Sequence, residues 1–446
     1  MEQTEQRIAR SPGFKTGLKL AVLLGLLLVF IVPLSMIGSL VDEREQRQRA
    51  TQEELISLQG GRQVVTGPFM LVPVTVTVVS DQGISREQIR EVAILPESLA
   101  TRVRLTPEIL TRGIYEVPVY QASVEMDIEF SLPQESALPV DRLVRVHWGE
   151  ARVAIGIQGV SGLRTQPVVA VDGRAAAVAS GNRQIGSARS GIAMAVSQAA
   201  PGSAHTATVA LALGGGGSIH FVPTAVRSSL TMTSPWPSPS FSGEMLPSSR
   251  SLTDDGFESH WETTSLGMGM PEAWLATDSS GSGEHWLHAN RIGVELFRPV
   301  GHYQRTTRSV KYGILFVLLP MVALFLLEVF TSVRIHPIQY LMVAAAKTVF
   351  YLLLLSLSEQ IGFTTAYWSA AAVTIILVTG YLSGLVARRG QALLVGGMVA
   401  TEYLFLFTAL QSEDYALLIG SLGLFVLLAV VMIATRKINW YAPGRS

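Results

Sequence analysis

Charged residues inside apolar segments are the first place where this sequence could carry chemistry. Lys347 lies near the middle of the run Leu341 to Leu355, LMVAAAKTVFYLLLL, and Glu328 and Glu402 lie inside two further apolar runs. A charged side chain near the centre of a membrane-spanning helix costs about 2.5 to 3.5 kcal/mol, so such residues are expected to face protein or water. One ammonium group and two carboxylates can form an intramembrane ion pair, which makes these three residues candidate sites.

Depth along the apolar runs decides which pair to expect. Lys347 and Glu402 fall near the middle of their runs, whereas Glu328 falls about a turn and a half from the cytoplasmic end. We therefore predict a Lys347–Glu402 ion pair, with Glu328 as the alternative partner of Lys347. In a third interpretation, the four-carbon stem of Lys347 carries its ammonium group to an interface without a partner.

Other reactive chemistry is not indicated by the sequence. It has no cysteine, which excludes disulfides and leaves His, Asp and Glu as metal ligands. It also has no G-x-S-x-G, Walker lysine or H-E-x-x-H motif. Gly214 to Gly217 precede a predicted strand, which favours a hairpin tip over a phosphate cradle, while Glu284, His285 and His288 lie in an expected exposed loop. We predict no catalytic residue, cofactor or metal site, and a protein that is not an enzyme.

The segment Ser234 to Pro247, SPWPSPSFSGEMLP, is unusual in composition. Its alternating prolines favour an extended, polyproline-like run, on which Trp236 and Phe241 are the large apolar groups. Two interpretations stay open: a rigid crossover whose aromatic side chains cap a β core, or a contact surface for a partner or lipid.

The elements that must position these residues follow from composition. Of the 446 residues, 48% are hydrophobic and 15% are charged, against about 25% charged in soluble domains. The formal net charge of zero gives no reason to expect a nucleic-acid partner. The first apolar run is predicted to be an uncleaved transmembrane anchor, and the other five to form a transmembrane region over 311–435. All six are near the ~20 residues that cross a bilayer: about 17–40, 312–333, 337–357, 364–386, 391–410 and 415–435.

Short connections between the runs predict the orientation, because basic residues are retained on the cytoplasmic side. One set of connections and the tail carry basic residues: Arg334, His336, Arg388, Arg389, Arg436 and Lys437. The opposite set carries acidic residues: Glu359, Glu413 and Asp414. We predict a multi-pass protein of the bacterial inner membrane, with a cytoplasmic N-terminus (1–16), a cytoplasmic tail (436–446) and a large periplasmic region between.

The periplasmic region is predicted to be a helical stalk followed by β structure. Residues 41–61 are rich in mixed charge and end in Gly60 and Gly61, which is typical of a helix end. From 62 to 310 the apolar period becomes two, as in VPVTVTVV, which indicates strands. No amphipathic helix is expected here. The Ala-, Gly- and Ser-rich segment 173–217 is interpreted as a flexible connector or as long hairpin loops, and a soft domain boundary is placed there. The predicted fold class is a membrane α+β protein with an all-β, sandwich-like domain of one or two lobes.

Several motifs resemble those of the CreD inner-membrane proteins, also called cell envelope integrity proteins. They lie in both halves of the chain: TGPFMLVPV from Thr66, WPSPSF from Trp236, KYGILF from Lys311, RIHPIQYL from Arg334, FYLLLLSLSEQIGF from Phe350, LQSEDYALLIGSLGLF from Leu410 and TRKINWY from Thr435. The resemblance implies an N-terminal anchor, a large periplasmic domain and a C-terminal helical cluster. It also implies a link to a two-component regulon, an envelope-stress response, and resistance to agents such as β-lactams and colicins.

The resemblance also changes which candidate residues we expect to carry the function shared by the family. The family position of Lys347 is usually apolar, so Lys347 is interpreted as a local feature compensated by Glu402. Shared function is assigned instead to Glu328, Arg334 and His336 at the cytoplasmic edge and to Ser358 and Glu359 outside. Departures from the family pattern stand at Gly301, Gln360, Ser238 and Asn439.

The predicted function is non-enzymatic support of cell envelope integrity, with the periplasmic β domain as scaffold, sensor or partner-binding module. Expected partners are the lipid bilayer and, through the β domain, envelope proteins or peptidoglycan-related partners. The alternative is a transporter or lipid-handling protein that uses the C-terminal helices, although these show no internal repeat of the kind found in many transporters. The sequence leaves the oligomeric state open.

Overall fold

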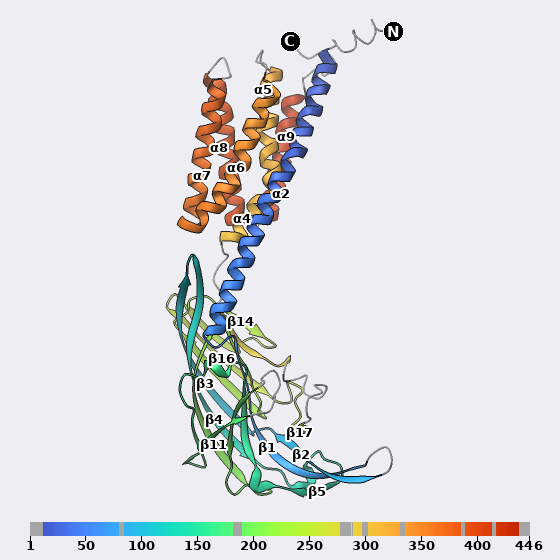
Figure 1. The fold of residues 1–446 in the computed structure, drawn as a ribbon, viewed down its shortest axis with the longest axis vertical. Coiled ribbons are helices and arrows are strands. Elements are labelled where there is room, and N and C mark those ends of the chain that lie inside the picture. The colour runs from blue at the N-terminus through green and yellow to red at the C-terminus, as the bar shows by residue number, and fades with distance from the viewer. Residues whose placement is uncertain are drawn as a thin grey trace. The chain divides into compact units, whose positions relative to one another are not determined.

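The structure is a computed structural model that describes residues 12–79, 84–181, 190–276, 287, 289–296, 302–330, 335–384, 389–412 and 416–436. Contacts divide the chain into two compact units (Figure 1), Met1–Gln48 with Val300–Ser446, and Arg49–Pro299. We call the first the helical unit and the second the β unit, and describe each by itself.

The helical unit consists of apolar helices. Five helices in the described residues are long and apolar enough to cross a membrane, and a sixth, α9, has a shorter apolar stretch, Leu418–Ile433. Each predicted apolar run therefore coincides with a helix in the described residues, and the last of these helices, α9, is 20 residues long. The helices are α2 (Pro12–Leu58), α4 (His302–Lys311), α5 (Gly313–Phe330), α6 (Pro337–Ile361), α7 (Phe363–Ser383), α8 (Arg389–Gln411) and α9 (Ala416–Thr435).

The predicted anchor and stalk form one continuous helix, α2, which begins in the helical unit and ends in the β unit. Gly60 and Gly61 follow it at φ of +111° and +80°, values that glycine adopts without steric cost. The N–H of Gly61 donates to the carbonyl of Ile56 at 2.8 Å. This is the glycine-ended helix that the stalk sequence predicts.

Helix α4 was not expected, since we predicted β structure as far as residue 310. Its sequence, HYQRTTRSVK, is polar, but Tyr303, Thr306 and Ser309 recur every three residues and are at most 1% exposed. A buried face made of one phenol and two hydroxyl side chains gives a weak apolar signal. The helical periodicity is therefore hidden from a reading based on hydrophobicity.

The β unit contains two large sheets in the described residues. One has ten strands, with a main order of β14-β18-β12-β1-β6-β10-β9, while β2 and β5 pair with β1, and β17 pairs with β2. Its strands are β1 (Gln63–Val79), β2 (Ser85–Ile94), β5 (Leu143–Val146), β6 (Arg152–Ile157), β9 (Val178–Gly181), β10 (Gly191–Ala195), β12 (Ser218–Val222), β14 (Pro239–Gly243), β17 (Ala273–Ala276) and β18 (Ile292–Leu296).

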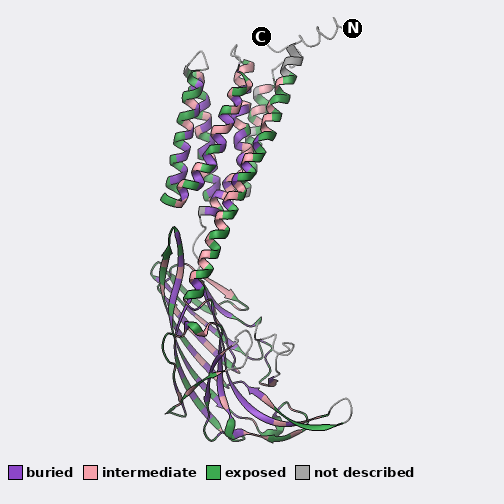
Figure 2. Ribbon diagram, in the orientation of Figure 1, coloured by how far each residue is buried: buried purple, intermediate pink, exposed green. Residues whose placement is uncertain are grey.

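The other sheet has eight strands, in the order β15-β16-β13-β3-β4-β11-β7-β8. Its long strands alternate between buried and exposed residues, most regularly along β4 (Figure 2). The buried side chains of both sheets form one core that includes Val72, Val124, Leu213, Met232 and Trp261. The strands are β3 (Ser98–Arg112), β4 (Tyr115–Ser131), β7 (Val168–Val171), β8 (Arg174–Ala175), β11 (Ala204–Gly216), β13 (Arg227–Ser234), β15 (Ser249–Thr253) and β16 (Gly256–Thr264).

The segment 173–217 is not a flexible connector, and the antiparallel pairing of β9 with β10 inside it agrees with the hairpin interpretation. It contains β11, which pairs with β4 along all thirteen residues from Ala204 to Gly216, and the contacts keep 49–299 in one unit. The glycines at the end of β11 permit close packing: a Cβ on Gly214 would lie 2.3 Å from Arg164 Nε. Low hydrophobicity here reflects tight packing rather than a loop.

The segment 143–158 also shows the apolar alternation that predicts strand structure. It forms β5 and β6, separated by a short 3-10 turn at Trp148–Glu150 in which Trp148 is buried. A buried aromatic residue is typical of a strand. The turn therefore cannot be distinguished from the two strands by composition.

Candidate functional site

The Lys347–Glu402 ion pair is the most deeply buried charge pair in the described residues of the helical unit. Lys347 Nζ lies 3.0 Å from Glu402 Oε2, and the two side chains are 1% and 3% exposed. Helices α6 and α8 supply one residue each. This arrangement matches the pair predicted from depth, and it excludes a Lys347 side chain that reaches an interface.

Aromatic rings surround the pair. Lys347 Nζ lies 3.9 Å from the centroid of the Tyr403 ring, a distance at which the ring quadrupole attracts a cation. Tyr403 also packs against Phe350, with ring centroids 4.6 Å apart, and its carbonyl accepts a hydrogen bond of 2.6 Å from the Tyr367 hydroxyl. Residues from α6, α7 and α8 therefore meet around one ammonium group.

Glu328 has a partner that the sequence reading missed. The ammonium group of Lys19, on α2, contacts Glu328 Oε2 and donates to the carbonyl of Ile335 at 2.7 Å. The hydroxyl of Tyr340 donates to Glu328 Oε2 at 3.2 Å. Lys19 was counted only as a positive flank of the first apolar run, and nothing in the sequence links it to a residue 309 positions away.

His336 begins helix α6. Its Nδ1 accepts a hydrogen bond from the N–H of Ile338 at 3.3 Å, and its own N–H donates to Gln339 Oε1 at 2.9 Å. With Pro337 at the first helical position, this is a reciprocal N-terminal cap. Arg334, the other basic residue assigned to this edge, lies outside the described residues.

Glu359, near the C-terminal end of α6, forms a third contact. Its Oε1 accepts a hydrogen bond of 2.7 Å from the Tyr303 hydroxyl, and its Oε2 lies 4.0 Å from Arg44 Nη1. Neighbouring Ser358 is 2% exposed and donates to the carbonyl of Leu355 at 2.9 Å. Glu359 thus has a partner on α2 and another on α4, whereas Ser358 bonds only within its own helix among these contacts.

Helix α6 therefore carries polar contacts at three levels. At 1.5 Å per residue, Tyr340 lies about 10 Å from Lys347 along the helix, and Glu359 about 18 Å beyond Lys347. Ion pairs connect α6 to α2 and α8, and tyrosine–carboxylate hydrogen bonds connect it to α4 and α5. Contacts of this kind at three levels position α6 against its neighbouring helices.

Trp236 and Phe241 lie against the core of the β unit. Trp236 is 9% exposed, and its indole N–H donates to the carbonyl of Ser238 at 3.1 Å. The Phe241 ring packs edge-on against Phe257 and Trp261, with centroids 5.7 and 5.9 Å away. This is the geometry of the core-capping interpretation. The other isolated candidates, Glu284, His285 and His288, fall outside the described residues.

A Ser–His–Asp chain occurs in the β unit, although no such grouping could be assembled from the sequence. Ser203 Oγ lies 2.8 Å from His205 Nε2, and His205 Nδ1 lies 2.8 Å from Asp172 Oδ2. Partial burial opposes ionisation of Asp172, but hydrogen bonds from His205 and from the N–H of Thr206 outweigh it and lower the pKa of this carboxyl. These distances are those of a nucleophile, a base and an orienting acid.

The surroundings of Ser203 argue against catalysis. Its Oγ accepts from the N–H of Ala200 at 3.1 Å and lies 2.8 Å from the Ala200 carbonyl. The N–H groups of Gly202 and Ser203 already donate to the carbonyls of Leu132 and Ala200. Acyl transfer needs free donors aimed at the developing oxyanion, and these amides are engaged. The hydrogen bonds between Ser203, His205 and Asp172 therefore stabilise the turn that leads into β11.

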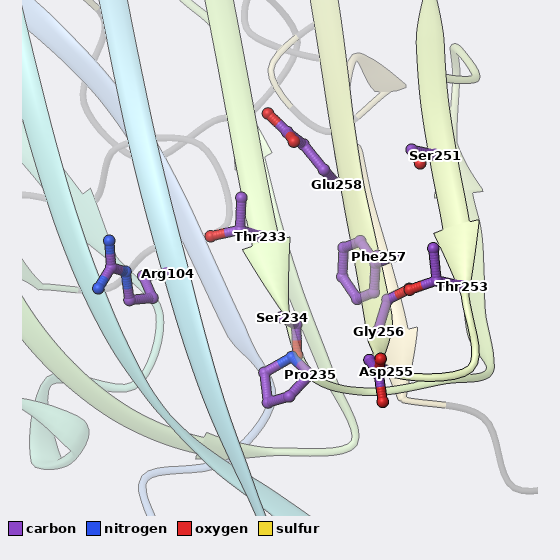
Figure 3. Close-up of a pocket in the computed structure, with 10 residues that line it drawn as sticks. All are labelled: Arg104, Thr233, Ser234, Pro235, Ser251, Thr253, Asp255, Gly256, Phe257 and Glu258. Carbon is purple, nitrogen blue, oxygen red and sulfur yellow. The ribbon is translucent and has the colours of Figure 1, made fainter.

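A polar groove lies on the exposed face of the eight-stranded sheet (Figure 3). It has a volume of about 490 Å³ and is lined from β3, β13, β15 and β16. Arg104 lies on one side of Thr233, and Glu258 lies on the other. No motif indicated this site, because its side chains come from four strands that are separated in the sequence by up to 154 positions, from Arg104 to Glu258.

A family model and one relative match nearly the whole chain. A family model described as inner membrane protein CreD matches residues 15–441. Inner membrane protein CreD of Escherichia coli (strain K12) is 30% identical over 436 residues, which cover 95% of this chain and 93% of that protein. Among solved structures, a two-domain M1 zinc metallopeptidase covers 38% of this chain and 39% of its own, at 10% identity and a TM-score of 0.20. A structural similarity this low carries no argument.

Proposed function

The chain belongs to the CreD family of inner membrane proteins, as its motifs predicted, and we propose that it supports cell envelope integrity without catalysing a reaction. In this proposal it acts in an envelope-stress response within a two-component regulon. Its β unit serves as the scaffold, sensor or partner-binding module, and envelope proteins or peptidoglycan-related molecules are the partners.

One observation carries this proposal: a separate compact β unit, Arg49–Pro299, is inserted in the chain between the first apolar helix and the others. A two-sheet unit with a continuous core is a stable platform for contacts. Three carboxylates of the helical unit, those of Glu328, Glu359 and Glu402, each pair with a basic side chain of the same unit, which suits an anchor. These features favour a protein that presents a domain at the membrane surface.

The proposed topology has α2 as the anchor, both termini in the cytoplasm and the β unit in the periplasm. It is supported by the charges of the connections and by α2 itself. Lys19 and Arg44 lie about 37 Å apart along this helix at 1.5 Å per residue, which exceeds the roughly 30 Å of bilayer hydrocarbon. Each of them pairs with an acidic residue of the helical unit, Glu328 or Glu359.

The absence of cysteine gives a direct test of topology. A membrane-impermeant maleimide should label Ser251→Cys in intact spheroplasts, because Ser251 is exposed in β15. Gln3→Cys should be labelled only after the membrane is permeabilised. The reverse pattern would overturn the proposed orientation.

The functional test separates the two units. The full chain should restore resistance to a β-lactam and to detergent in a strain that lacks it. A variant with 49–299 replaced by a short flexible linker should insert in the membrane but fail to restore resistance. If the linker variant restores resistance fully, the function belongs to the helices and the proposed role of the β unit is wrong.

Lipid handling or transport by the helical unit is the second candidate function. A groove of about 750 Å³ between α5, α8 and α9 favours it, with an entirely apolar lining that includes Leu319, Val395 and Phe425. An acyl chain is the ligand chemistry that such a groove fits. The test compares the wild-type protein with two variants, Glu402→Gln and the groove-filling Ala323→Trp. The measurement is lipid transfer or substrate flux in vesicles. This alternative requires both variants to remain folded and to lose flux.

A further inference from the structure

The groove of Figure 3 is built by residues in register across four strands. Ser251 pairs with Glu258, Glu258 with Thr233, and Thr233 with Arg104. Neighbouring strands are about 4.8 Å apart, so Arg104 and Glu258 arise roughly 10 Å apart, with the Thr233 hydroxyl between them. Asp255, in the turn between β15 and β16, adds a second carboxylate on the Glu258 side.

The charges that line this groove are unpaired within the described residues. Arg104, Glu258 and Asp255 are all exposed, and none forms an ion pair with a described residue. The next residues on the same face behave differently. Arg102 lies 2.8 Å from Asp127 and 3.5 Å from Glu125, and Glu262 lies 3.2 Å from His260.

This contrast separates the groove from the rest of the sheet surface. The hydrogen bond and the charge of Asp127 raise the pKa of Arg102. Strand β3 therefore carries one arginine that is paired with an acid, with which Arg104 can be compared. Arg104 lies two positions further along β3, on the same face of the sheet, and is also exposed. It lines the groove and does not pair with an acidic side chain of the described residues. The groove therefore holds one guanidinium on the β3 side and two carboxylates on the β15–β16 side, Glu258 along the strand and Asp255 at its turn.

We propose that the groove binds a short, extended peptide that carries both a free carboxylate and a free ammonium group. Arg104 binds the carboxylate in the bidentate geometry that guanidinium favours. Glu258 binds the ammonium group, Asp255 adds negative charge on the same side of the groove, and the hydroxyls of Thr233 and Ser251 face the peptide backbone. An extended chain rises about 3.3 Å per residue, so a span of roughly 10 Å accommodates about three residues.

Charge selects this ligand over simpler ones. A purely anionic ligand that contacts Arg104 is repelled by the two carboxylates, and a purely cationic ligand is repelled by Arg104. The volume of about 490 Å³ lies within the range of about 300 to 1,000 Å³ typical of small-ligand sites. This inference rests on the proposed partner-binding role of the β unit and adds the chemical class of one partner.

The test uses the full-length protein in lipid nanodiscs and isothermal titration calorimetry. Trialanine with free ends is the probe, and N-acetyl-trialanine amide, which lacks both charges, is its matched control. We expect the free peptide to bind at least about tenfold more tightly than the blocked one, a difference of roughly 1.4 kcal/mol.

Matched variants separate the groove from the rest of the surface. Arg104→Gln and Glu258→Gln should each weaken trialanine binding by about tenfold or more, as loss of a charged contact does. Arg102→Gln and Glu262→Gln, on the same strands and face, should leave binding within about twofold. A melting curve for each variant shows whether the β unit stays folded.

Three results overturn the inference: no binding of trialanine at millimolar concentration, equal binding of the blocked peptide, or equal effects of the groove and reference variants. None of them decides the proposed function, which depends on the linker variant described above. A chain that fails to bind trialanine but still restores resistance loses only the groove ligand.

Discussion

The two units place the same kind of ion pair in opposite surroundings. In the helical unit, Lys347 and Glu402 are 1% and 3% exposed, whereas in the β unit Arg102 and Asp127 are 57% and 51% exposed. Water solvates either partner of the exposed pair when the other is removed, but nothing solvates Glu402 without Lys347. The same contact is therefore a structural requirement in one unit and nearly neutral in the other.

The largest effect is expected from breaking the buried pair. Lys347→Leu leaves the carboxylate of Glu402 buried and unpaired, which should lower the free energy of unfolding of the helical unit by about 3 to 5 kcal/mol. The measurement is thermal unfolding of full-length protein in detergent micelles, followed by native fluorescence. Lys347→Arg, which retains the charge, is the comparison variant.

A double variant shows whether the loss comes from an uncompensated charge. Lys347→Leu with Glu402→Leu removes both charges and should recover most of the lost stability, since a buried pair is often replaceable by apolar residues. Additive losses in the double variant would mean that the two residues act independently, and the comparison between the units would then fail.

The next effect concerns Trp236, which belongs to the core of the β unit rather than to its surface. Trp236→Ala should lower the stability of this unit by about 3 kcal/mol or more, because it removes a buried indole and leaves a cavity. Leu252→Ala, at a position 52% exposed, is the control and should change melting little. A stable Trp236→Ala protein that loses a cross-linked partner would restore the contact-surface interpretation.

A smaller, pH-dependent effect is expected at Asp172, which is partly exposed. Its pKa is lowered in the folded state, so its ionised form contributes stability above the unfolded value of about 3.9, and this contribution is lost as pH falls through the folded value. Asp172→Asn should therefore lower the free energy of unfolding at pH 7 by about 1 kcal/mol or less. The measurement is the melting temperature, which should be lower than that of the wild type.

The pH profile distinguishes this effect from general acid unfolding. The difference between wild type and Asp172→Asn should shrink as the pH falls from about 4 through the lowered pKa of Asp172, below which both proteins carry a neutral side chain at this position. Asp254→Asn, an exposed residue outside the His205 chain, is the control. A difference that stays constant from neutral to acid pH would show that charge at Asp172 contributes nothing.

The sequence predicted those features of the two units that depend on local period and depth. The apolar runs locate helices α5 to α9, the alternation in β4 is regular, and counting from the run ends is enough to pair Lys347 with Glu402. These signals are local because each helix or strand repeats its own pattern. The pairing succeeded because a bilayer restricts where a lysine and a glutamate can meet.

Features that depend on distant contacts were missed. Lys19 meets Glu328 from the other end of the chain, and the Asp172–His205 bond connects a turn after β7 to the start of β11. In β11, small residues fit between Arg164 and Tyr120, so close packing gave the composition of a linker. Sequence reading fails where strand order or close backbone approach, rather than hydrophobicity, selects the residue.

The smallest effect is expected from the exposed pair, and it completes the comparison. Arg102→Gln should leave the melting temperature of the β unit almost unchanged, because water replaces the guanidinium as the partner of Asp127 and Glu125. A double-mutant cycle with Asp127→Asn should give a small coupling that declines in high salt. The Lys347–Glu402 coupling should instead persist in high salt, since ions do not enter the packed helices. Similar coupling energies and salt dependence for both pairs would mean that burial does not set the strength of these contacts.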